Sequence, residues 1–91
     1  MDKNVGKLLK KNEQLNQLDS AKVSSHVQRE VGEWIKNTLM IEGYDVPFKY
    51  SRKKKYKSLQ GALVNLTYYP QLESVGGMEL ETMKVIRIRR S

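Results

Sequence analysis

Residues 20–42 read SAKVSSHVQREVGEWIKNTLMIE, and this stretch has the strongest periodicity in the chain. At about 100° per residue its apolar side chains fall on one arc of a helix, while Arg29 and Lys36 fall opposite. Gly43 directly after the stretch is a helix stop signal. The pattern predicts a long amphipathic helix with Trp34 in the core, and the arc consists of Val23, Val27, Val31, Trp34, Ile35, Thr38, Leu39 and Ile41.

Upstream, residues 1–19 read MDKNVGKLLKKNEQLNQLD and carry a narrow apolar seam. The seam spans only about two heptads, and Asn12 interrupts it, which is too little for a coiled coil. Two interpretations stay open for 1–19, an N-terminal helix that docks or dimerises and a partly frayed arm. The remaining residues, 20–91, are predicted to form a single domain.

Downstream of the stretch, the period of the apolar residues changes to two. The segment 44–50 alternates apolar and polar side chains as a strand does, and Pro47 would confine this strand to a sheet edge. The segment 58–69 fits both helical and extended spacing, but its β-branched and aromatic residues favour a strand, which Pro70 would end. Gly76 and Gly77 then permit a tight turn.

The last strand is expected after that turn, with Arg87 and Arg89 on its solvated side. These elements predict an α+β fold: two N-terminal helices, the second long and amphipathic, followed by a three-stranded antiparallel sheet packed on the long helix.

The charge of the chain is concentrated in its second half. Residues 1–48 carry seven Lys and Arg against seven Asp and Glu, whereas residues 49–91 carry ten against three, so the whole net charge of +7 lies after residue 48. The segment 49–57, KYSRKKKYK, holds six of these cations and no carboxylate. A basic surface of this kind is typical of proteins that bind phosphate backbones.

The sequence therefore favours a non-enzymatic protein that contacts RNA or DNA phosphates through a basic patch. Tyr56, and Tyr50 if its side chain is not buried, would stack on exposed bases. The predicted nucleic-acid-binding residues are Lys49, Arg52, Lys53, Lys54, Lys55, Tyr56, Lys57, Arg87, Arg89 and Arg90, with Lys53, Lys54 and Lys55 as the central contacts.

Other uses of the same residues stay open. A lysine-rich loop can simply protect a sheet edge from aggregation. A small adaptor or regulatory subunit that docks on an acidic protein partner is the second interpretation, and a small basic ribonuclease is the third. A homodimer through the N-terminal helix or an open sheet edge is also compatible with the small core.

Residues that carry common catalytic chemistry are scarce. The chain has no cysteine and a single histidine, His26, which the helical pattern puts on the polar surface. No catalytic residue, metal site or cofactor is predicted, because one imidazole without thiolates does not build an ordinary transition-metal site. No apolar run approaches the roughly twenty residues of a membrane span. We therefore expect no membrane contact and a cytoplasmic protein, or a nuclear one if the source is eukaryotic or viral.

Overall fold

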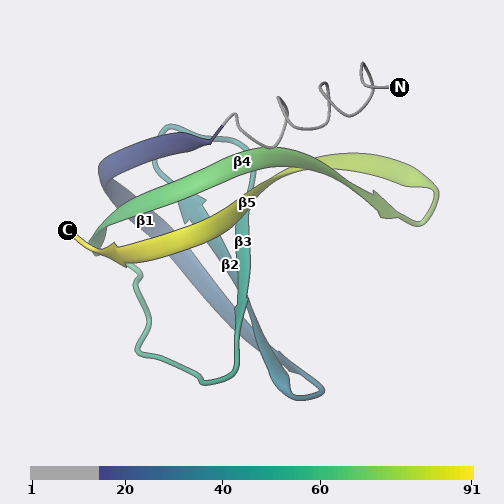
Figure 1. Cartoon of the computed structure of the whole chain (residues 1–91), viewed down its shortest axis with the longest axis horizontal. Helices are drawn as coiled ribbons and strands as arrows, with labels where there is room; N and C mark the ends of the chain where they lie inside the picture. The colour runs from purple at the N-terminus through teal and green to yellow at the C-terminus, as the bar shows by residue number, and fades with distance from the viewer. Residues whose placement is uncertain (1–14) are drawn as a thin grey trace, which may run out of the picture.

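A computed structural model describes residues 15–91, and over this range the chain forms five strands and no helix (Figure 1). The strands are β1 Asn16–Val31, β2 Trp34–Ile41, β3 Phe48–Arg52, β4 Leu63–Val75 and β5 Met78–Arg90. They close into a barrel in the order β1-β2-β3-β5-β4. Neighbouring strands are antiparallel except for β3 and β5, which pair in parallel. This topology is that of the OB-fold, a five-stranded Greek-key barrel.

The predicted α+β fold class is therefore wrong, and the correction is largest in residues 20–42. This stretch forms most of β1, a turn and β2, with Val31 opposite Trp34 at the end of the hairpin. Gly32 starts the turn at a φ of 63°, a conformation that costs glycine little. The β-branched residues of the stretch suit a pleated surface better than a helix. Trp34, predicted to be a core residue, keeps 45% of its surface exposed.

Other parts of the predicted architecture change with it. The element predicted over 1–19 lies mostly outside the described residues, and the chain is already in β1 from Asn16 onward. The sheet has five strands instead of three. The strand near Pro47 is not an edge, because β3 lies between β2 and β5 and the Pro47 carbonyl accepts a hydrogen bond from the Met83 amide at 2.9 Å. Pro70 does not end its strand either, since β4 continues to Val75.

The core fills the barrel interior with side chains from all five strands. Phe48, at its centre, is fully buried and makes edge-to-face contacts with Tyr44 and Tyr68 at ring-centroid distances of 5.5 and 5.0 Å. The β4–β5 hairpin turns through Gly76 and Gly77, both at positive φ, and extends beyond the barrel as an arm, as does the β1–β2 hairpin (Figure 1). The remaining buried apolar residues are Val23, Ile35, Leu39, Ile41, Tyr50, Val64, Leu66 and Val85.

The connection from β3 to β4 is held against β1 by hydrogen bonds along its length. The side-chain amide of Gln28 donates to the Tyr56 carbonyl at 2.7 Å, and the amide of Gly61 donates to the Val23 carbonyl at 2.8 Å. The C-terminus is anchored as well, because the Ser91 amide donates to the Leu63 carbonyl at 2.9 Å. Both basic segments of the sequence are therefore fixed to the barrel. In residues 15–91 there is no helix with the length and apolar character to cross a membrane.

Burial of Tyr68 makes the stability of the barrel decrease with pH in the alkaline range. Burial raises the pKa of Tyr68, and the neighbouring Tyr44 raises it further. Because the unfolded tyrosine ionises first, this group stabilises the fold fully below about pH 10, and the contribution is lost as the pH rises toward its folded pKa. We expect Tyr68→Phe to lose less unfolding free energy than wild type between about pH 9 and 11, measured by urea denaturation. Equal losses would contradict the burial of this hydroxyl.

Candidate nucleic-acid interface

The inner face of the sheet changes from apolar to polar toward one end of the barrel. Along β3 the inward positions run from Phe48 through Tyr50 to Arg52, which pairs with Ile35 of β2. On β5, Arg90 lies opposite the buried Val64 and therefore on the same inner face. Arg52 and Arg90 are the last residues of β3 and β5, so both lie at strand ends.

A pocket of about 290 Å³ lies at this end of the barrel, and we call it the barrel-end pocket. Its apolar wall comes from tyrosine side chains and from Leu59 and Ile88, while His26 and Asn37 supply neutral polar groups. Four cations complete the lining, and they come from three separate segments of the chain: Arg52, Lys57, Arg89 and Arg90.

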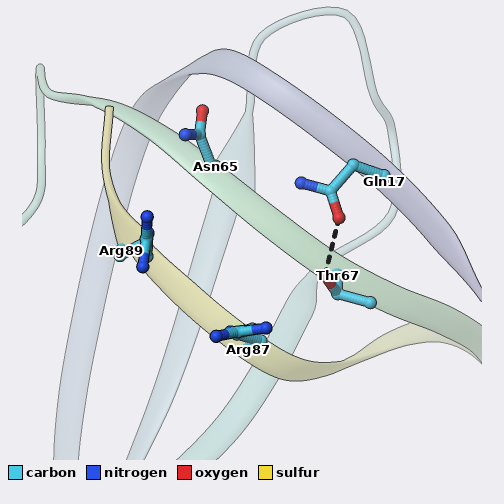
Figure 2. Close-up of a pocket in the computed structure, with 5 residues that line it drawn as sticks. All are labelled: Gln17, Asn65, Thr67, Arg87 and Arg89. Carbon is cyan, nitrogen blue, oxygen red and sulfur yellow. Dashed lines mark hydrogen bonds between the residues drawn. The ribbon is translucent and has the colours of Figure 1, made fainter.

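A second pocket, of about 220 Å³, lies on the outer face of β1, β4 and β5. Figure 2 shows Arg87 and Arg89 side by side on β5, facing Thr67 and Asn65 of β4. The Thr67 hydroxyl donates a hydrogen bond to the side-chain oxygen of Gln17 at 2.7 Å, which ties β1 to this face. Arg89 lines both this pocket and the barrel-end pocket, so the two adjoin.

A third pocket, of about 240 Å³, lies where β3 and β5 diverge, and it shares Arg52 with the barrel-end pocket and Arg87 with the outer one. Any two of these three pockets therefore share at least one lining residue from the end of β3 or the last residues of β5. We call the part of the protein surface formed by the cations of these three pockets the basic surface. Its cations are Arg52, Lys57, Arg87, Arg89 and Arg90.

No carboxylate lines any of these three pockets. Among residues 15–91 there are two ion pairs, and neither involves the basic surface. By strand register, Glu30 is the acid nearest to Arg52, because both residues pair with Ile35 from opposite sides, yet no ion pair joins them. The positive charge of the basic surface is therefore available to an external anion.

Several cations predicted to share the interface lie elsewhere. Lys49 is on the outer face of β3, where its Nζ is 2.9 Å from a carboxylate oxygen of Glu73. Lys53 has its Nζ 5.0 Å from the ring centroid of Trp34 and 3.7 Å from a carboxylate oxygen of Glu33.

Lys54 and Lys55 are exposed in the β3–β4 connection and line none of these three pockets. The three central lysines of the sequence prediction thus flank the basic surface instead of forming its middle.

The two tyrosines of the basic segment have different environments. Tyr50 is buried, and burial raises the pKa of its hydroxyl although Arg52 beside it acts in the opposite direction. Tyr56 is 54% exposed. The guanidinium carbon of Arg52 lies 5.4 Å from the ring centroid of Tyr50 and 5.2 Å from that of Tyr56, so Arg52 links the buried ring to the exposed one.

His26 and Asn37 line the barrel-end pocket, and neither was among the predicted site residues. The Nδ1 atom of His26 accepts a hydrogen bond from the Leu59 amide at 2.8 Å, so its Nε2 carries the proton and donates to the side-chain oxygen of Asn37, also at 2.8 Å. Both ring nitrogens are thereby engaged, and His26 is inside the barrel instead of on a helix surface. The described residues contain no group of three or more acids and histidines placed to hold a metal ion.

Comparison of the chain with protein-family models, with curated proteins and with solved structures finds no match.

Proposed function

We propose that this protein binds single-stranded RNA or DNA, with the strand's phosphates held by the basic surface. The observation that carries the proposal is the convergence of five cations from the end of β3, the β3–β4 connection and β5 on one surface that no carboxylate lines. Four of the five are arginines, whose planar guanidinium groups bind phosphate oxygens through two parallel hydrogen bonds. These arginines lie on paired strands, so their backbone positions are fixed before binding.

The barrel topology supports the same proposal by analogy. OB-fold barrels bind oligonucleotides and oligosaccharides on their strands and connecting loops. Since one fold hosts many functions, this analogy raises the expectation of binding without assigning the site.

A single strand fits the surface better than a duplex. Proteins that bind single strands without sequence preference combine a positive groove with aromatic side chains on which unpaired bases stack. The basic surface is hollowed into three adjoining pockets, and the exposed ring of Tyr56 borders one of them. Bases within a duplex cannot enter such pockets because they are already paired and stacked.

The proposal predicts a defined salt dependence. Each phosphate contact on a single strand contributes about 0.7 to the slope of log affinity against log salt, so five contacts give a slope of about −3.5. The measurement is fluorescence anisotropy of a labelled single-stranded oligonucleotide, titrated over a salt series and compared with a duplex of equal length. Absence of binding to either nucleic acid at low salt would show that the proposed function is wrong.

An acidic protein partner is the second candidate, and one observation favours it. The β4–β5 arm exposes apolar side chains that do not serve the basic surface: Leu72 and Met78 are each 64% exposed, and Val75 is 54% exposed. Val75 and Met78 pair directly across the two strands of the arm, and neighbouring exposed apolar side chains are typical of protein–protein contacts. If the titration finds no nucleic acid bound, this interpretation accounts for both the arm and the cations.

A further inference from the structure

The barrel-end pocket combines features that the phosphate contacts alone do not require. A surface that only neutralises phosphates needs exposed cations, yet this pocket also has an aromatic and aliphatic wall and neutral polar groups at its floor. Its volume of about 290 Å³ is close to the lower limit, about 300 Å³, of small-molecule sites. A pocket of this size suits one small planar group and not a run of stacked bases.

The aromatic wall is arranged for stacking. Tyr56 projects from the β3–β4 connection, whose backbone is fixed at the same residue by the hydrogen bond from Gln28 to its carbonyl. The guanidinium carbon of Arg52 lies 5.2 Å from the Tyr56 ring centroid, within cation–π distance. The ring is therefore held at the pocket while more than half of the residue's surface stays exposed.

The floor of the pocket retains hydrogen-bonding capacity. Asn37 uses one N–H of its amide on the Ile35 carbonyl and one lone pair of its oxygen on His26, which leaves one donor and one acceptor on the same amide. Such a pair matches the adjacent donor and acceptor groups on the edge of a nucleobase. Asn37 keeps only 3% of its surface exposed, and because the Nε2–H of His26 needs an acceptor, the amide oxygen is the atom that faces His26.

The cations at the rim complete the arrangement. Lys57, Arg89 and Arg90 line the same pocket, so a base inside it would have its flanking phosphates beside positive charge. From these contacts we infer that the barrel-end pocket holds one unstacked nucleobase of the bound strand, stacked on Tyr56. This inference rests on the proposed function, since it specifies how part of the same surface engages a single strand.

The test compares two oligomers of equal length and charge, oligothymidylate and an abasic deoxyribose-phosphate chain. Stacking of one base on an aromatic side chain contributes roughly a 5- to 100-fold gain in affinity. Wild type is expected to prefer the oligomer with bases by a factor in this range. Tyr56→Ala should lose that preference while binding the abasic chain as wild type does, and Tyr56→Phe should keep it.

A matched control is Trp34→Ala, which removes the exposed aromatic side chain of the β1–β2 hairpin and should leave the preference intact. If Tyr56→Ala keeps the preference, or if wild type binds both oligomers equally, the inference is wrong although the proposed function stands. If wild type binds neither oligomer, the proposed function itself fails. Loss of the preference in Trp34→Ala alone would place the base on the hairpin instead.

Discussion

Phe48→Ala is expected to destabilise the barrel by about 3–5 kcal/mol, the usual cost of truncating a fully buried phenylalanine. Phe48 has no exposed surface, and its ring contacts Tyr44 and Tyr68, so the substitution removes two aromatic pairs and leaves a cavity. A domain of this size has roughly 4–12 kcal/mol of stability in total. The variant should therefore unfold at a much lower urea concentration, or fail to fold at ordinary temperature.

The control for this prediction is Trp34→Ala. Trp34 is nearly half exposed on the outer face of the hairpin, so its truncation should cost about 1 kcal/mol or less. A helix over residues 20–42 predicts a large loss, because Trp34 would be in the core. Urea denaturation followed by circular dichroism distinguishes the two, and a loss at Trp34 as large as that at Phe48 would contradict the barrel.

The helical pattern of residues 20–42 has a physical origin in the barrel. A β-bulge between Val23 and Ser25 moves the inward side from Val23 to His26, a step of three residues. After the bulge the inward residues of β1 have even numbers, and after the turn at Gly32 the inward residues of β2 have odd numbers, beginning with Ile35. The buried apolar residues of the predicted arc are joined by Val27, Val31 and Trp34, which are exposed on the outer face of the hairpin. Apolar residues from both faces together match a 3.6-residue period, so periodicity alone could not identify these strands.

Extended segments with undisturbed alternation were easier to predict. The alternation through Phe48 and Tyr50 predicted a strand, and β3 contains both residues facing inward. The glycine pair at 76–77 predicted a tight turn, which the β4–β5 hairpin has. What the sequence could not supply was the pairing of strands distant in the chain, above all the parallel contact of β3 with β5.

The membership of the basic surface depends on that same pairing. Lys49 and Arg52 are three residues apart in one basic run, yet they lie on opposite faces of β3. The sequence does contain one signal for the inward cations. Arg52 follows Tyr50 by two residues and Arg90 follows Ile88 by two residues, so each arginine lies on the same strand face as an apolar inward residue. His26 had no such signal, since the bulge before it determines which way it faces.

Charge reversal of Arg87 and Arg89 to glutamate is expected to lower the affinity for a single-stranded oligonucleotide several hundredfold. At about 0.1 M salt, a contact that adds 0.7 to the salt slope contributes roughly a fivefold gain, so loss of two contacts costs about 25-fold. Each introduced glutamate also repels the phosphates, and this repulsion is of similar size in log units. Together the two effects give the several-hundredfold loss of affinity. The salt slope should fall from about −3.5 toward −2 in the same titration.

The design isolates the surface from net charge. Arg29→Glu with Lys36→Glu changes the net charge by the same amount, at a cross-strand pair of β1 and β2 that lines none of the three pockets of the basic surface. This control should lose much less affinity than the Arg87 and Arg89 variant, because neither of its side chains lines a pocket of the basic surface. Circular dichroism checks that both variants fold, since all four side chains are exposed.

Equal losses in the two variants would mean that binding depends on net charge alone. A greater loss of affinity in Arg29→Glu with Lys36→Glu would mean that the nucleic acid binds the outer face of β1 and β2 instead. The proposal requires the loss to follow Arg87 and Arg89, because Arg89 lines both the outer pocket and the barrel-end pocket and Arg87 lines both the outer and the third pocket.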